Sequence, residues 1–462
     1  MPLDSEKLRA RLRALQRQHP APAAASDDVR PLEPAAETAS GAARELRYVP
    51  EEGVSVAPEA VTGCVILERH YALDLQHGAR RVSQYAEVIH RCLPALAVLG
   101  ADARAAGVPA PAKPARLEFE SAGRWRDDRV RPGVPTRGPL LFFDLETTGL
   151  SGGAGTLAFL VGCGYFDDSG FHTRQYFLAG YEAEHELLLN LTELASRFGG
   201  LVTFNGRTFD VPLIDTRYLF HRLPSPFGEL PHFDMLHPAR RLWRRRHDEA
   251  SCALGSLEEA ILGVHRVGDV PGMEIPARYF HYLRTGDLEP LQPVFEHNRL
   301  DLISLAALTA VGMGMVDAGP AAIPSSHEAL GFGHLYAAMG LMEPAEACYA
   351  RAAGLHATTA ARTRAEANPW RAEALRRLAI QRRRQRRFDE AADAWRGIVD
   401  DGSDDPLVQE ARRALAIHHE HRNVDLVKAR AFAERALADE RDPREIEALQ
   451  HRLARIARKL GP

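Results

Sequence analysis

Residues 139–149, PLLFFDLETTG, decide the fold of the central part of this 462-residue chain. A short apolar run that leads into a glycine-containing turn predicts a buried β-strand. Two acids, Asp144 and Glu146, stand near its end with one residue between them. Because alternate side chains of a strand point to the same face, we expect the two carboxylates to lie side by side.

The segments that follow alternate between strand and helix patterns. The apolar stretches 156–166 and 171–180 flank the turn sequence DDSG and predict a hairpin. Residues 182–198 have helical periodicity, residues 200–206 (GLVTFNG) predict another strand, and residues 209–222 another helix. The order βββαβα is that of a ribonuclease-H-like sheet with helices on its faces. We therefore predict an α/β, ribonuclease-H-like domain over residues 138–312.

The segments on either side of this domain differ in composition. Residues 1–45 are rich in Ala, Pro and Ser and predict a flexible N-terminal arm. Residues 46–137 are predicted to be a lead-in segment with short strands and a helix. Residues 326–462 predict an all-α domain of tetratricopeptide-like (TPR-like) helical repeats, closed by a capping helix. Small and aromatic residues stand where a TPR has them at Gly333, Tyr336, Gly340, Ala345, Tyr349 and Ala352. Two further copies align on Ala391 and Trp395 and on Ala429, but the intervals between Ala345, Ala391 and Ala429 are 46 and 38 residues. These exceed the repeat length of roughly 34 residues, so the repeats are degenerate, with insertions in the loops.

Asp144 and Glu146 suggest metal chemistry. Two-metal cleavage of a phosphodiester needs several carboxylates that converge on divalent cations. Mg²⁺ prefers oxygen ligands, so one acid can reach a first ion and the other a second. Thr147, Thr148 and Gly149 follow as a turn whose small residues let a nucleic-acid end approach the backbone. A pair of solvated acids at a strand end is the alternative interpretation, and the motifs further along the chain argue against it.

Three motifs, in order, resemble those of the DEDD exonuclease superfamily. DLETTG (144–149) is similar to its first motif, FNGRTFD (204–210) to its second and EHNRLDLISL (296–305) to its third. With FDMLHPARRLWRRR (233–246) and IPARYFHYLRTG (275–286), they resemble the YprB-like, ribonuclease-H-like exonucleases over about residues 62–312. The resemblance implies a metal-dependent nuclease, a 3′–5′ exonuclease that uses two Mg²⁺ or Mn²⁺ ions bound by Asp144, Glu146, Asp210 and Asp301.

The positions of these residues agree with such roles. Asp210 falls in the first turn of a predicted helix, where the helix dipole stabilises a carboxylate, although alone it would be interpreted as a helix cap. Asn205 can orient a ligand or contact a phosphate. His297 and Asp301 are four residues apart on a predicted helix and share one face.

His297 is the candidate general base, because an imidazole titrates near neutrality and can deprotonate the attacking water. Within the superfamily, however, the base is a His five residues before the aspartate or a Tyr four residues before it. His297 has the tyrosine spacing, so its role is a hypothesis.

A cluster of arginines at 240–246 surrounds Leu242 and Trp243. A groove with arginines and an aromatic ring can bind phosphates and stack a base, which makes Arg244 and Arg245 candidate substrate contacts. A solvated helix face in an arginine-rich chain is the alternative. Arginines also gather at 362–387, where they either extend the nucleic-acid path or face solvent.

Composition limits the other classes. The net charge of −4 gives no global reason to expect nucleic acid, and the five cysteines contain no CxxC pair. That pattern argues against a zinc ribbon or a disulfide framework and fits a reducing compartment. The N-terminus lacks the apolar region of a signal peptide, and no apolar run approaches the length that crosses a bilayer. We therefore expect a cytoplasmic protein that does not bind a membrane.

Two other functions stay open. The α/β part can be a non-catalytic nucleic-acid-binding scaffold whose repeats recruit a protein partner, or a structure-specific endonuclease. A single-stranded end of DNA or RNA is the expected substrate. The choice between DNA and RNA depends on contacts to the sugar 2′ position, which the sequence does not reveal.

Overall fold

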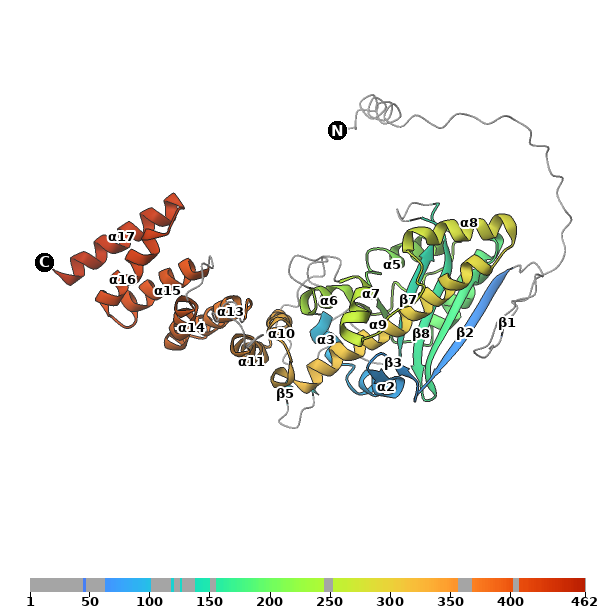
Figure 1. Ribbon diagram of the computed structural model, residues 1–462, viewed down its shortest axis with the longest axis horizontal. Coiled ribbons are helices and arrows are strands. Elements are labelled where there is room, and N and C mark those ends of the chain that lie inside the picture. The colour runs from blue at the N-terminus through green and yellow to red at the C-terminus, as the bar shows by residue number, and fades with distance from the viewer. Residues whose placement is uncertain are drawn as a thin grey trace, which may run out of the picture. The chain divides into compact units, whose positions relative to one another are not determined.

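The computed structural model describes residues 63–100, 138–149, 155–244, 252–355, 368–401 and 407–461, and the backbone of two-residue strands at 45–46, 118–119 and 125–126. Its main sheet has seven strands in the order β1-β2-β9-β8-β7-β10-β11 (Figure 1). These strands are β1 Glu45–Leu46, β2 Cys64–Ala72, β7 Leu140–Thr147, β8 Ala158–Asp167, β9 Gly170–Leu178, β10 Gly200–Thr203 and β11 His232–Asp234. Two small sheets pair β3 (Gln76–His77) with β4 (Arg80–Arg81) and β5 (Glu118–Phe119) with β6 (Trp125–Arg126).

Strand β7 lies between an antiparallel and a parallel neighbour. It pairs antiparallel with β8 and parallel with β10, while β9 continues beyond β8 and β11 beyond β10. The strands β7 to β11 therefore lie in the spatial order third, second, first, fourth, fifth along the chain. This mixed sheet confirms the α/β class that the alternation of strand and helix patterns predicted.

Helices cover both faces of the sheet (Figure 1). In this part of the chain they are α2 Val82–Arg91, α3 Ala95–Leu99, α4 Glu184–Ala195, α5 Asp210–Phe220, α6 Leu236–Leu242, α7 Leu254–Leu257, α8 Ile275–Thr285 and α9 Gln292–Ala318. A π-helical turn, η4, follows α7 at Glu258–Leu262, and 3-10 turns occupy Tyr181–Ala183, Gly272–Glu274, Glu289–Leu291 and Pro320–Ala322.

The described part of the segment 46–137 is built into this sheet. Every residue of β2, from Cys64 to Ala72, pairs antiparallel with a residue of β9. Helices α2 and α3, which follow, pack against α9. The segment expected as a lead-in thus contributes a strand and two helices to the core beside the predicted α/β domain.

Alternate residues of β7 point into two different cores. Phe143 belongs to the core that α4, α5 and α8 complete, whereas Phe142 belongs to the core that α9 completes. Asp144 and Glu146 continue the alternation of Phe142 along the strand. Their carboxylates therefore point toward the face of the sheet that α9 covers.

The helix that covers this face is long and apolar. By length and composition alone the span Glu289–Ala318, with a mean hydropathy of 1.6, could cross a membrane. This corrects the expectation that no apolar run approaches that length. The structure accounts for this apolar composition, because 67% of the most apolar 18-residue stretch of the helix is buried inside the protein. Residues such as Leu302 and Leu305 belong to the core beside the sheet.

In the described ranges 326–355, 368–401 and 407–461 the C-terminal part consists of helices and their connections, as predicted. They are α10 Ser326–Ala338, α11 Met342–Gly354, α13 Arg371–Arg384, α14 Phe388–Asp400, α15 Leu407–His421, α16 Leu426–Ala438 and α17 Pro443–Leu460. Helix α10 packs on α11, α13 on α14, α15 on α16, and α17 on α16. A Cβ at Gly333 would lie 2.4 Å from a ring carbon of Tyr349, so the glycine is needed for the close approach of α10 to α11.

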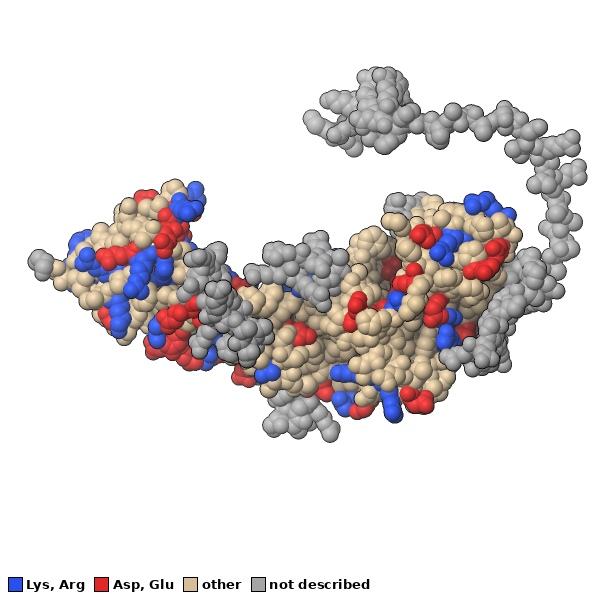
Figure 2. All heavy atoms as spheres, viewed as in Figure 1, with Lys and Arg blue, Asp and Glu red and all other residues tan. Residues whose placement is uncertain are grey.

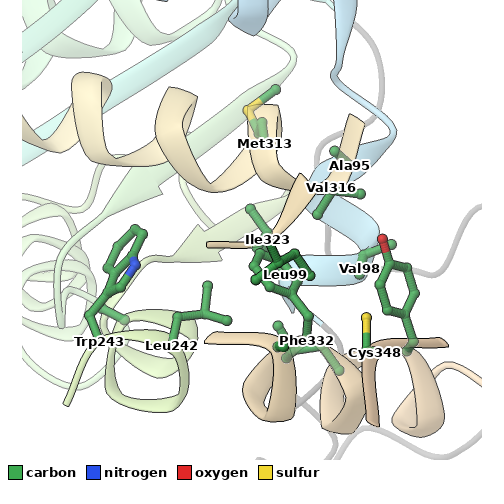
Figure 3. Close-up of a cluster of buried hydrophobic side chains, with 14 of the residues drawn as sticks. Ala95, Val98, Leu99, Leu242, Trp243, Met313, Val316, Ile323, Phe332 and Cys348 are labelled. Carbon is green, nitrogen blue, oxygen red and sulfur yellow. The ribbon is translucent and has the colours of Figure 1, made fainter. Parts of the chain in front are cut away.

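The first of these hairpins shares a hydrophobic core with the α/β part. Figure 3 shows Phe332 of α10 in one cluster with Leu242 and Trp243, at the end of α6, and Leu99 of α3. The indole Nε1 of Trp243 also donates a 3.1 Å hydrogen bond to Oε1 of Glu328. Two residues of the arginine-rich segment 240–246 are therefore core residues and do not face a groove.

Candidate active site

Four acidic side chains from three elements come together. Asp144 and Glu146 belong to β7, Asp210 is the first residue of α5, and Asp301 lies in α9. Burial raises the pKa of Asp144 and of Glu146 well above the ordinary value, and the charge of Asp301 is the next largest cause for both. Burial, followed by the charge of Asp234, raises the pKa of Asp210 to about 7. These carboxylates lie close enough to repel one another, and a bound cation would relieve that repulsion.

Asp144 is held by an amide from α9. Nδ2 of Asn298 donates a 2.8 Å hydrogen bond to Oδ2 of Asp144, and Oδ1 of Asn298 accepts a 2.8 Å hydrogen bond from Nε2 of Gln175 on β9. Asn298 is fully buried. A Cβ at position 162 would lie 2.3 Å from Oδ1 of Asn298, so Gly162 on β8 provides the space for this amide. The network fixes the orientation of the Asp144 carboxylate through its Oδ2.

Asp301 and His297 share a second set of partners. Nη2 of Arg266 donates to Oδ1 of Asp301. The His297 ring lies one turn before Asp301, with Nε2 at 3.6 Å from Oδ2 of Asp301 and Nδ1 at 2.6 Å from Oδ1 of Asp269. Burial alone would raise the pKa of Asp269, but His297 and Arg266 together lower it below its ordinary value. The ionised Asp269 orients the imidazole so that Nε2 faces Asp301.

A sharp turn places Asp210 at the start of α5. Asn205 adopts a positive φ of 68°, and its backbone N–H donates to Asp234 Oδ1 at 2.8 Å. Oδ2 of Asp234 accepts from the backbone N–H of Arg207 at 3.1 Å. A Cβ at Gly206 would lie 2.8 Å from Oδ2 of Asp210. Asp234 therefore holds the loop that positions Asn205 and Asp210.

The threonine hydroxyls of the turn after β7 form hydrogen bonds to nearby backbone groups. Oγ1 of Thr147 donates a 2.9 Å hydrogen bond to the carbonyl of Gly149, and Oγ1 of Thr148 accepts a 3.0 Å hydrogen bond from the N–H of Leu157. Thr147, Thr148 and Gly149 were predicted to bind substrate. In the structure the two hydroxyls shape the turn, and the backbone N–H of Thr148 donates to the carbonyl of Leu157 at 2.9 Å, so the hydrogen bonds that these groups form lie within the protein.

A pocket of about 430 Å³ adjoins the acids. Its lining residues are Asp144, Phe204, Asn205, Leu236, Arg240, Cys252, Ala253, Leu254 and Asp301. Of the predicted substrate contacts, Asn205 lines this pocket. Arg244 is exposed and is not a lining residue, and Arg245 lies outside the described residues. Among the described residues, the arginine that lines the pocket is Arg240, one turn earlier in the cluster.

The donor set suits hard divalent cations. All four proposed ligands are carboxylates, and Mg²⁺ and Mn²⁺ prefer oxygen ligands. Among the residues that the structure describes, no three acidic, His or Cys side chains are already arranged to hold an ion. Asp301 is paired with Arg266 and Asp144 with Asn298, so each of these acids has a partner of its own. The residues fit a divalent ion by donor type and by their crowded negative charge.

Sequence reasoning did not assign Asn298, Gly162, Arg266 or Asp269. Asn298 is one of five asparagines in the chain, and a glycine inside a strand often marks a close approach, so the first two carried signals. Arg266 and Asp269 lie in an irregular loop without a motif. Only the contact of that loop with α9 shows their place in the site.

Several arginines of α13 and its flanks are paired within the helical part. Arg382 and Arg387 lie 2.9 and 2.6 Å from carboxylate oxygens of Glu346 on α11, and Arg376 lies 2.6 Å from Glu410 on α15. Figure 2 shows acidic side chains beside basic ones on the viewed face of these helices. These pairs join successive hairpins, which gives the arginines a structural role that needs no nucleic acid.

The strand order and the acidic cluster define the class of the protein. A sequence model of the RNase_H superfamily matches residues 141–311, which contain all four acids. A domain of this superfamily indicates a nuclease that acts on nucleic acid, and such domains generally use divalent metal ions.

A curated relative identifies the family more closely. The chain is 32% identical over 332 residues to "Uncharacterized protein YprB" of Bacillus subtilis (strain 168), an alignment that covers 69% of this chain and 75% of the relative. The chain belongs to the YprB family. The resemblance inferred from the motifs is confirmed for the RNase_H superfamily and for YprB.

Proposed function

We propose that this protein is a metal-dependent 3′–5′ exonuclease of the DEDD type, which hydrolyses a single-stranded end of DNA or RNA with two Mg²⁺ or Mn²⁺ ions. The observation that supports it best is the meeting of Asp144, Glu146, Asp210 and Asp301, whose burial and mutual charge raise the pKa of Asp144 and Glu146. A half-buried cluster of carboxylates without function would destabilise the fold. Bound divalent ions would offset that repulsion.

When bound, the ions supply charge that activates a water and stabilises the leaving oxygen. The residues of the protein orient the carboxylates and the base, and they accept the proton. Asn298 fixes Asp144 through its amide, and Asp269 fixes His297 through Nδ1. Nε2 of His297, on the side of Asp301, then accepts the proton of the attacking water. His297 thereby acts as the general base despite its unusual spacing.

The pocket supports cleavage at the end of a nucleic-acid strand. Its volume of about 430 Å³ falls within the range of small-molecule sites, which suits one nucleotide better than a continuous strand. The apolar side chains Phe204, Leu236 and Leu254 can contact a base, and Arg240 can contact a phosphate. The 3′–5′ polarity follows from the likeness to DEDD exonucleases.

The test uses the full chain with end-labelled single-stranded DNA and RNA, with and without Mn²⁺. We expect stepwise shortening that requires the metal and is lost in Asp144→Asn. Glu193→Gln, which alters an exposed acid of α4, is the matched control and should cut like the wild type. Cleavage of circular DNA would replace the exonuclease proposal with an endonuclease. A wild type that is inert on every substrate would leave the non-catalytic scaffold as the function.

We also propose that the helical hairpins are TPR-like and bind a protein segment. The glycine–tyrosine contact between α10 and α11, and the buried Ala391 and Ala429 in the later hairpins, support this assignment. A pull-down with the full chain, compared with a chain truncated after α9, tests it. A partner that binds both equally would exclude the repeats as the binding site.

The expected compartment is the cytoplasm. All five cysteines are buried and lie outside disulfides, which suits a reducing environment. Fractionation of cells that produce the tagged protein tests this.

A further inference from the structure

Arg266 is a buried cation among acidic side chains. Its side chain is 7% exposed. Nε lies 2.5 Å from Oε2 of Glu258, Nη2 donates to Asp301, and Nη1 lies 3.5 Å from Oδ2 of Asp269. Nη1 is also 3.5 Å from Nδ1 of His297. One guanidinium thus contacts a proposed metal ligand, the proposed base and the acid that orients that base.

A chain of buried polar groups holds Arg266 in this place. The Glu258 side chain is 1% exposed and accepts a hydrogen bond from Oγ of Ser304 on α9. Oγ of Ser304 lies 2.9 Å from Nε2 of His77, which belongs to the segment before the predicted α/β domain. Because Glu258 fixes Nε of the planar guanidinium, the neighbouring Nη2 points at Asp301 and Nη1 at Asp269. The position of Arg266 is therefore set from outside the acidic cluster.

The charge of Arg266 bears directly on the cluster. Repulsion from Asp301 is, after burial, the largest cause of the raised pKa of Asp144 and Glu146. The charge of Arg266 acts on Glu146 in the opposite direction. A metal ion that approaches Asp301 meets a carboxylate whose Oδ1 already has a cationic partner. The same guanidinium that orients Asp301 must then compete with the metal.

We propose that Arg266 is the resident counter-ion of the site, a positioning residue that neutralises and orients Asp301 until a divalent cation binds, and that restrains the affinity for that cation. The inference rests on the proposed function, since Asp301 must be a metal ligand. Removal of the Arg266 charge should therefore strengthen metal binding but lower turnover. A purely structural role for Arg266 would weaken both.

The experiment measures Mn²⁺ binding to the full chain by the loss of the free Mn²⁺ signal in electron paramagnetic resonance, together with turnover on a labelled oligonucleotide. In Arg266→Gln we expect roughly tenfold tighter Mn²⁺ binding. A positive charge in contact with a carboxylate shifts the binding of another cation to that carboxylate by about a factor of ten or more. Turnover should fall roughly 10–100-fold, because Asp301 and His297 lose their orientation. Arg197→Gln, which alters an exposed ion pair with Glu193 on α4, should leave both values unchanged.

Arg266→Lys separates charge from orientation and serves if Arg266→Gln does not fold. Lysine keeps the charge but cannot bridge Glu258 and Asp301 with a planar fork. We expect Mn²⁺ affinity within about twofold of wild type and a loss of turnover similar to that of Arg266→Gln. Unchanged or weaker Mn²⁺ binding in Arg266→Gln, or full turnover in Arg266→Lys, overturns the proposal. A wild type that binds Mn²⁺ but cuts nothing contradicts the proposed function and leaves the counter-ion role intact.

Discussion

The side-chain amide of Asn298 donates a 2.8 Å hydrogen bond to Asp144 across 154 positions of the sequence. It thereby ties the helix that contains Asp301 to the strand that contains the first two acids. The amide is itself held by Gln175, whose Nε2 also donates to the carbonyl of Phe295 at 2.9 Å. The geometry of Asp144 on β7 thus depends on residues of two other elements, α9 and β9.

Substitution of Asn298 by alanine should reduce nuclease activity without removing any proposed ligand. Partners of metal ligands typically contribute a factor of roughly 10–100 to metal affinity or activity, so we expect a loss of that size. The measurement is the rate of shortening of a labelled oligonucleotide as Mn²⁺ is varied. Asn423→Ala, at an exposed turn between α15 and α16, is the control. A wild-type rate in Asn298→Ala would mean that Asp144 is oriented without this amide.

His297 and Asp269 should act as one unit. His297→Ala removes the proposed base, and we expect turnover to fall by about 10²–10⁴. Asp269→Asn leaves the imidazole in place but unoriented, so its loss should be smaller, roughly tenfold or more. The double variant should be no slower than His297→Ala alone, because the orienting acid has nothing left to orient. If the two losses multiply instead, Asp269 acts independently of the imidazole.

Arg240 should contact a phosphate of the bound strand, whereas Arg244 should not. Each phosphate contact contributes about −0.7 to the slope of log affinity against log salt for single strands. We expect Arg240→Ala, in the catalytically inactive Asp144→Asn background, to weaken binding and to flatten that slope by about this amount. Fluorescence anisotropy with a labelled oligonucleotide at several salt concentrations gives both values. Equal slopes for Arg240→Ala and the matched Arg244→Ala would remove Arg240 from the substrate path.

Glu420 should make the C-terminal helices sensitive to acid. Its buried carboxylate lies 2.6 Å from Arg455 and from Arg452 and 3.2 Å from Lys459, all on α17. The Arg455 hydrogen bond is the main reason that the pKa of Glu420 falls from 4.5 to about 2. A carboxyl whose pKa is lower in the folded state stabilises the fold fully above about pH 4.5 and loses this contribution as the pH falls toward 2.

The corresponding variant is Glu420→Gln. We expect a loss of about 1–3 kcal/mol at neutral pH, the usual contribution of hydrogen bonds to a charged group, and a much smaller loss near pH 2. Urea unfolding of the full chain, followed by circular dichroism between pH 2 and 7, measures it. Glu447→Gln, an exposed acid of α17, should have little effect at any pH. The same difference between Glu420→Gln and wild type at pH 2 and pH 7 would contradict the assignment.

Local backbone geometry allowed part of this protein's structure to be predicted from the sequence alone. The alternation of side chains along a strand places Asp144 and Glu146 on one face, and the 3.6-residue period of a helix places His297 one turn from Asp301. Both relations span a few residues, so backbone geometry alone determines them. The α/β class and the helical C-terminal part followed from the same periodicities, and the structure confirms both.

Contacts between distant segments were decided only by the tertiary structure. Nothing in the local pattern shows that β2 joins the sheet beside β9, that Asn298 reaches Asp144, or that Arg240 rather than Arg244 lines the pocket. Local backbone geometry and the packing of distant elements therefore each determine a part of the site at FFDLETTG. The sequence by itself determined which acids can share a face, because that depends on the rise and twist of one strand or helix. Which neighbours hold them, including Arg266, depends on how separate elements pack, and packing is a property of the whole chain.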